Sequence, residues 1–261
     1  MTWTIRPRSK SGLMAAVTRG GGPLVLLIHG VGLRAEAWSA QIDYLSRTCR
    51  VVAIDMPGHG KSSPLSDKAE LADFTDRIAL TLEEPAIVVG HSLGAMIALN
   101  MAIRYNAQVK GVVALNAIYG RDPGAKAATI ARANSLDGKT IADPTETLQR
   151  WFNGEPSSES NACEEWLKSV DPAAYRTAYR IFAHEDGPKA SDLKKLKCPA
   201  LFVTGDQEPN STPSMSENMA ELVVNGRAEI FRGAAHMLPM THSTQLNRLL
   251  ATFVAQASER I

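Results

Sequence analysis

Ala86-Ile-Val-Val-Gly-His-Ser-Leu-Gly-Ala-Met-Ile97 is the stretch of sequence that decides the fold. Its first residues form a β-branched apolar run that indicates a buried strand, and its last residues begin an Ala-rich segment that indicates a helix. Ser92 lies at the bend, between Gly90 and Gly94, in the pattern G-x-S-x-G. Such a sharp turn strains the backbone of its central residue and exposes the hydroxyl, which predicts that Ser92 is a nucleophile. The alternative is an ordinary loop of glycine and serine, which needs neither the strand nor the helix.

Short apolar runs bounded by turn residues recur along the chain, and each has the length of a strand that is buried on both faces. The predicted strands are 24–28, 51–54, 86–89, 112–115, 200–203 and 228–231. Helical patterns lie between most of them, at 38–45, 70–82, 93–105, 214–223 and 243–257. Residues 3–5 and 13–17 are expected to form an antiparallel hairpin before the first buried strand. The alternation predicts an α/β fold with a mostly parallel sheet between two layers of helices.

The regular alternation stops between residues 118 and 194, where short helical pieces carry several aromatic side chains. We therefore predict a core of residues 1–118 and 195–261 with a helical cap of residues 119–194 inserted into it. An insertion after the carboxyl end of a strand lies over the crevice where open α/β sheets bind ligands. Trp151, Trp166 and Tyr179 are the candidate substrate-binding residues of this cap. The alternative for each is a packing role within the helical unit.

A serine hydroxyl is a weak nucleophile, so it needs a base to take its proton and a third group to orient that base. Asp206 directly follows a predicted strand, and His236 follows the last predicted strand after a Gly-Ala-Ala loop. Both are expected at the same sheet edge as Ser92. The order Ser, Asp, His along the chain is that of one scaffold for this triad. We predict Ser92, Asp206 and His236 as the catalytic triad, with Glu208 as the alternative carboxylate.

The other histidines are weaker candidates for the base. Three of them belong to turns with other roles, one lies in the cap and one lies further along the chain than His236: they are His29, His59, His91, His184 and His242.

The transition state also needs two backbone N–H groups to hold the developing oxyanion. Leu93 is the first residue of the helix after the nucleophile, where free amides and the positive end of the helix dipole face the site. Val31 lies in the loop Ile28-His-Gly-Val-Gly32, where glycines let the backbone bend toward a substrate. We predict Val31 and Leu93 as the oxyanion hole. An ordinary glycine turn is the alternative for the Val31 loop.

Composition limits the classes of partner and the cell compartment that we expect for this protein. The chain has 261 residues, a formal net charge of +1 and three cysteines, so it carries no electrostatic footprint for nucleic acid or an anionic membrane. Odd, widely spaced cysteines without a C-x-x-C pair fit a reducing cytoplasm. No signal core or membrane-length apolar run is present in the sequence. We expect a cytoplasmic monomer or homodimer that acts on a small molecule.

Three segments carry a resemblance to the α/β-hydrolase superfamily. His29-Gly30 matches its HG loop, Asp55-Met-Pro-Gly-His-Gly-Lys-Ser62 matches its D-x-P-G-x-G-x-S segment, and Gly90 to Gly94 matches its nucleophile elbow. The resemblance covers nearly the whole chain and implies an eight-stranded sheet with an inserted cap. Residues 29–38 are similar to small bacterial carboxylesterases, including pimeloyl-carrier methyl esterases. Enol-lactone hydrolases and aminoacrylate hydrolases look similar as well. Ala95 departs from the pattern, since many relatives have a second glycine there.

The resemblance implies hydrolysis of a carboxylic ester, lactone or thioester through an acyl-serine, with no metal and no organic cofactor. A serine at the elbow argues against dehalogenase and epoxide hydrolase chemistry, which need a carboxylate nucleophile. Carbon–carbon bond hydrolysis, perhydrolysis and a non-catalytic ligand receptor are the alternatives on the same fold. One cationic side chain of the cap region could also hold an acidic group of the substrate, although such side chains are usually solvated. These cations are Arg121, Lys126, Arg132, Arg176 and Arg180.

Overall fold

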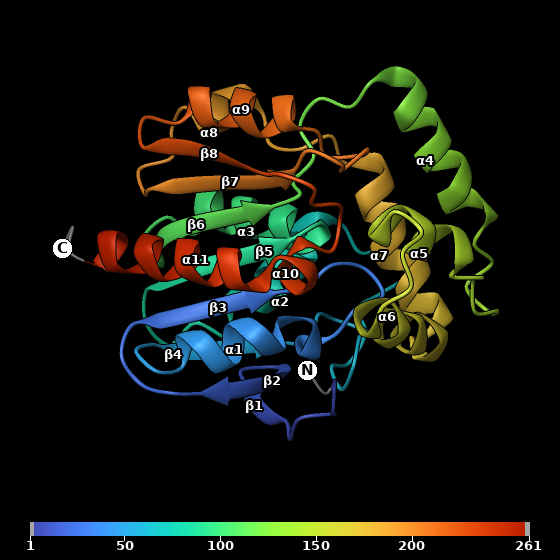
Figure 1. The fold of residues 1–261 in the computed structure, drawn as a ribbon, viewed down its shortest axis with the longest axis horizontal. Coiled ribbons are helices and arrows are strands. Elements are labelled where there is room, and N and C mark those ends of the chain that lie inside the picture. Colours follow the sequence, from blue (N-terminus) through green and yellow to red (C-terminus); the bar gives the residue numbers. More distant parts are fainter. Residues whose placement is uncertain (1–2, 259–261) are drawn as a thin grey trace.

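The centre of the molecule is one eight-stranded sheet with strand order β1-β2-β4-β3-β5-β6-β7-β8, seen edge to edge in Figure 1. The computed structural model describes residues 3–258. Its strands are β1 (Ser9–Ser11), β2 (Met14–Arg19), β3 (Leu24–Ile28), β4 (Arg50–Ile54), β5 (Ala86–His91), β6 (Val109–Leu115), β7 (Ala200–Gly205) and β8 (Gly226–Phe231). All pairs from β4 to β8 are parallel, whereas β2 pairs antiparallel with β1 and β4. The predicted mostly parallel, eight-stranded sheet is confirmed.

Helices cover both faces of this sheet. The helices within residues 3–258, some of which lie at one end of the sheet rather than on its faces, are η1 (Ala35–Trp38), α1 (Ser39–Leu45), α2 (Leu71–Ala79), α3 (Leu93–Arg104), α4 (Pro123–Ser135), α5 (Thr145–Phe152), α6 (Ser158–Ser169), α7 (Pro172–His184), α8 (Ala190–Leu193), α9 (Pro213–Leu222), α10 (Leu238–Thr241) and α11 (Ser243–Ser258). Alternate residues of β3 point to opposite faces: Leu26 packs in the core beneath α2 and α3, and Leu27 packs beneath α1 and α11. Burial on both faces explains why the strand sequences are continuously apolar.

The N-terminal hairpin differs from the prediction. Its first strand is Ser9–Ser11 rather than residues 3–5, and Gly12, with φ of +54°, is part of the two-residue turn to β2. Residues 3–8 have no strand assignment. The side chains of Arg6 and Arg8 reach the carboxylates of Asp43 and Glu36. These ion pairs hold the segment over the helix that follows β3, so it does not pair with the sheet.

Helices α4 to α7 lie together at one end of the sheet, in the long connection between β6 and β7 (Figure 1). This arrangement supports the proposed division into a core of 1–118 and 195–261 and a cap of 119–194. No helix within residues 3–258 is both long enough and apolar enough to cross a membrane. The carboxyl ends of the parallel strands and the helices α4, α5 and α7 enclose the site described next.

Candidate active site

Ser92 lies between β5 and α3 in the strained conformation that the sequence predicts. Its φ is 56° and its ψ is −121°, a combination that non-glycine residues rarely adopt. A Cβ on Gly90 would lie 2.0 Å from the carbonyl oxygen of Gly94, and a Cβ on Gly94 would lie 2.2 Å from that of Ile28. The strand and helix can therefore cross only because both positions are glycine, and this crossing sets the orientation of Ser92.

His236 and Glu208 form a buried pair beside the nucleophile. His236 Nδ1 lies 2.6 Å from Glu208 Oε2, and the side chain of Glu208 has no exposed surface. The other oxygen, Oε1, accepts from the backbone amides of Asn210 and Ser211 at 2.7 and 3.4 Å. Burial raises the pKa of the Glu208 carboxyl, but the charge and hydrogen bond of His236 and the two amides lower it further, so its pKa lies below the ordinary value. Glu208 is thus held as a carboxylate against the imidazole.

The expectation that Asp206 orients the imidazole is wrong. Asp206 is exposed, and its Oδ1 accepts from the amide of Gly233 at 2.7 Å. Strand β7 continues to Gly205, two residues beyond the predicted end, and the chain then turns, with the Glu208 amide donating to the Gly205 carbonyl. This turn directs the carboxylate of Glu208 toward His236 and that of Asp206 toward solvent. The position of the strand alone could not show which carboxylate faces His236, because the direction of each side chain depends on the tight turn.

Three buried histidines, His29, His59 and His91, hold the backbone around the site. His91 Nε2 lies 2.8 Å from the carbonyl oxygen of His236, and burial lowers the pKa of His91 well below its ordinary value. A neutral His91 must donate from Nε2, because a carbonyl only accepts. His91 therefore anchors the loop that carries His236.

The loop with Val31 is fixed by two further histidines. His29 Nε2 accepts from the amide of Met56 at 2.9 Å, and His59 Nε2 accepts from the amide of Gly32 at 3.0 Å. Burial, together with the nearby His59, lowers the pKa of His29 to about 3, so His29 stays neutral. Within the described chain, the amides of Val31 and Leu93 have no protein acceptor. Both amides are free for an oxyanion.

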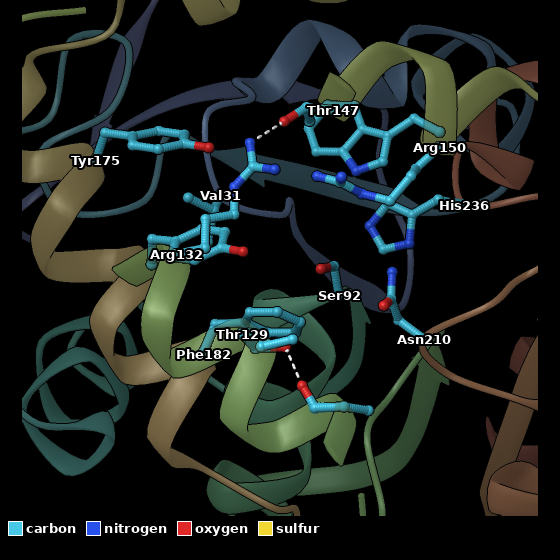
Figure 2. A pocket seen from close by; sticks show the side chains of 14 residues that line it. Val31, Ser92, Thr129, Arg132, Thr147, Arg150, Tyr175, Phe182, Asn210 and His236 are labelled. Atoms are coloured by element: carbon cyan, nitrogen blue, oxygen red, sulfur yellow. Dashed lines mark hydrogen bonds between the residues drawn. The ribbon is translucent and has the colours of Figure 1, made fainter. Parts of the chain in front are cut away.

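Ser92 and His236 line one cavity of about 260 Å³ between the strand ends and helices α4, α5 and α7 (Figure 2). No hydrogen bond joins the Ser92 hydroxyl to His236 among the described residues, so proton transfer requires the two side chains to approach. Trp151 stacks on the His236 ring, with centroids 5.4 Å apart and planes at 24°. Tyr179 also lines the cavity. Trp166 does not: it packs in a separate cluster, edge-on to Trp3.

The structure separates the cationic candidates of the cap. Four of them bind protein groups outside the cavity: Arg121 donates to carbonyls at the end of α7, Lys126 pairs with Asp186, Arg176 donates to Asp137 O, and Arg180 donates to Asp67 O and Ala69 O. Arg132 lines the cavity. Sequence reasoning missed Arg150 and Asn210, which line it as well. Arg150 directly precedes the candidate Trp151 in α5, and this neighbour was the sequence signal that could have identified it.

Within residues 3–258, no group of three or more metal-ligating side chains is placed to hold a metal ion.

Comparison with known proteins shows the family to which this chain belongs. The model of the alpha/beta hydrolase family matches residues 25–249. The chain is 37% identical to the (E)-2-((N-methylformamido)methylene)succinate hydrolase of Acinetobacter baylyi, over 90% of this chain and 92% of that protein. It is 28% identical to the pimeloyl-[acyl-carrier protein] methyl ester esterase of Methylococcus capsulatus, over 92% and 98%. An esterase from Thermogutta terrifontis has the same fold, with a TM-score of 0.84 at 22% identity over 97% and 99% of the two chains. The chain therefore belongs to the alpha/beta hydrolase family, and the prediction of a hydrolase of the esterase type is confirmed at that level.

Proposed function

We propose that the protein is a serine hydrolase that cleaves a carboxylic ester, lactone or thioester of a small molecule through an acyl-serine intermediate. One observation carries this proposal: a buried Glu208–His236 pair, 2.6 Å apart, lies at the same cavity as a nucleophile-elbow serine. A buried carboxylate beside an imidazole costs desolvation energy that a mere binding site does not require. An enzyme is therefore favoured over a ligand receptor.

The reaction proceeds in two halves. His236 Nε2 takes the proton of the Ser92 hydroxyl as Oγ attacks the substrate carbonyl carbon, and the amides of Val31 and Leu93 hold the oxyanion. The imidazolium then protonates the leaving alcohol or thiol as the bond to the carbonyl carbon breaks. Water, deprotonated by the same histidine, attacks the acyl-serine, and the imidazolium returns the proton to Ser92 Oγ as the acid leaves. Glu208 accepts the Nδ1–H bond throughout and stabilises the imidazolium.

A panel of substrates tests this function. It comprises p-nitrophenyl esters of graded chain length, lactones and thioesters, with mono-esters of dicarboxylic acids included because the A. baylyi relative is named for a succinate derivative. Carbon–carbon and perhydrolysis substrates extend the panel to the two other reactions that this triad supports.

The nucleophile is tested by comparing Ser92→Ala with Ser214→Ala, a matched change at an exposed position of α9. Ser92→Ala is expected to lose about 10³-fold or more in kcat on every active substrate, and Ser214→Ala to keep the parent rate. Turnover by Ser92→Ala at the parent rate would exclude Ser92 as the nucleophile.

A further inference from the structure

Two guanidinium groups, those of Arg132 on α4 and Arg150 on α5, line the cavity above Ser92, and the lining contains no carboxylate (Figure 2). Arg132 keeps 22% of its side chain exposed and Arg150 keeps 39%. Positive charges that are partly withdrawn from water are stabilised by an anion or by several acceptors nearby. The protein partners of these two groups within residues 3–258 are neutral side chains and one exposed carboxylate.

Arg132 has mainly neutral partners. Its Nη2 donates to the Thr147 hydroxyl at 2.6 Å, as Figure 2 shows, and its guanidinium lies 5.6 Å from the centroid of the Tyr179 ring. A guanidinium has five N–H donors, and the hydroxyls of Thr147 and Tyr175 accept from Arg132, so several of its donors remain for a ligand.

One carboxylate already lies near both arginines. Glu146 Oε2 lies 3.5 Å from Arg132 Nη1 and 3.7 Å from Arg150 Nη1. Both distances exceed those of normal hydrogen bonds, and the Glu146 side chain is 79% exposed, so water screens these pairs. The contact nevertheless shows that both guanidiniums can approach one carboxylate at the same time. Glu146 does not line the cavity, so it leaves the cavity side of the pair open.

We propose that Arg132 and Arg150 form a carboxylate subsite, and that the substrate carries a carboxylate in addition to the carbonyl that Ser92 attacks. This inference rests on the proposed function for the reacting end of the substrate. Arginine binds carboxylates with paired, charge-assisted hydrogen bonds, which fix orientation as well as charge. The cavity of about 260 Å³ lies at the small end of ligand pockets. Together these features select short acids, such as half-esters or half-thioesters of four- to six-carbon dicarboxylic acids, over long neutral acyl chains.

Binding is measured first, without catalysis. Isothermal titration calorimetry follows succinate, glutarate and adipate added to the Ser92→Ala protein, with their monomethyl and dimethyl esters as probes of lower charge. At least one diacid is expected to bind, and Arg132→Gln or Arg150→Gln to weaken it by about 10- to 100-fold, the loss typical of a hydrogen bond to a charged group. Arg176→Gln is the matched control, because Arg176 lies on α7 outside the cavity, and it should bind as the parent does.

Catalysis is measured second, with proteins that keep Ser92 and with pairs of acidic and neutral substrates. Each mono-p-nitrophenyl ester of a dicarboxylic acid is compared with its methyl-capped, neutral counterpart after subtraction of the spontaneous rate. Both Gln variants should lose about 10- to 100-fold in kcat/KM on the acidic ester and less than about 3-fold on the neutral one. Arg132→Lys and Arg150→Lys, which keep the charge, should retain part of the preference and show that folding is intact.

Equal losses on acidic and neutral esters, or diacid binding that both Gln variants retain, would overturn the carboxylate subsite. These outcomes differ from failure of the proposed function. If Ser92 were not the nucleophile, Ser92→Ala would keep its turnover, while the calorimetry would still report whether the arginines bind a carboxylate.

Discussion

Replacing Glu208 by glutamine tests which carboxylate supports the base, because Gln has the same shape without the charge. Both oxygens of the Glu208 carboxylate accept hydrogen bonds, whereas the amide of Gln has only one accepting oxygen. Oε2 meets His236 Nδ1 at 2.6 Å and Asn116 Nδ2 at 3.2 Å, and Oε1 accepts from the amides of Asn210 and Ser211. If the Gln oxygen stays with the backbone amides, its NH₂ faces His236 and favours the tautomer that cannot accept the serine proton. If the amide flips, its NH₂ opposes two backbone donors.

Either orientation also removes the negative charge that stabilises the imidazolium. Breaking a buried charged pair costs about 3–5 kcal/mol, which in a transition state corresponds to about 10²- to 10⁴-fold in rate. We therefore expect Glu208→Gln to lower kcat by about 10³- to 10⁴-fold, the upper part of this range, because the tautomer is disturbed as well. The assay is steady-state hydrolysis of p-nitrophenyl acetate, with the melting temperature measured in parallel.

Asp206→Asn is the matched control. Its Oδ1 can still accept from the Gly233 amide, and the side chain is exposed, so kcat should change by less than about 3-fold. A loss in Asp206→Asn equal to that in Glu208→Gln would refute this assignment of the acid.

Three further predictions concern the elbow, the buried histidines and Glu146. Gly94→Ala should lower the free energy of unfolding by about 1–3 kcal/mol or more, because its Cβ would lie 2.2 Å from the Ile28 carbonyl oxygen; urea unfolding measures this, and Gly21→Ala, which meets no atom within 4 Å, should be close to neutral. His29, His59 and His91 have pKa values lowered from 6.5 by burial, so unfolding takes up protons as the pH falls below 6.5, and stability should fall by up to about 1.4 kcal/mol per pH unit for each histidine. A further loss is expected below pH 4.5, where protonation removes the stabilisation from the lowered pKa of Glu208; stability that is constant from pH 7 to pH 4 would contradict both assignments. Glu146→Gln should raise the affinity of the Ser92→Ala protein for diacids by about 2- to 5-fold, because it removes a screened competitor for the two arginines; weaker binding in calorimetry would show that Glu146 holds the arginines in place instead.

The fold and the nucleophile could be predicted because local rules dictate them. A continuously apolar strand of five or six residues is buried on both faces, and Gly90 and Gly94 are required where α3 passes the ends of β5 and β3, because an added Cβ would lie 2.0–2.2 Å from a carbonyl oxygen. His236 was predictable for a similar reason, since it follows a strand whose end lies at the same sheet edge.

The acid and the cavity lining could not be predicted with the same certainty. The choice between Asp206 and Glu208 depends on a turn whose hydrogen bonds include several to residues 231–234, which lie far along the chain. Trp151 and Trp166 are both cap aromatics, yet α5 places the first over His236, whereas α6 places the second in a cluster beside the cavity, against which Trp151 also packs. Helical periodicity identifies an apolar face but not the partner that covers it.

Covalent labelling is the most direct test of the central claim that Ser92 is the nucleophile. The parent protein, incubated with an alkyl fluorophosphonate and analysed by intact-mass and peptide mass spectrometry, should gain one phosphonyl group on the peptide that carries Ser92. Ser92→Ala should gain none, and Glu208→Gln should react much more slowly than Asp206→Asn. A label on any other peptide, or a label that persists in Ser92→Ala, would contradict the account.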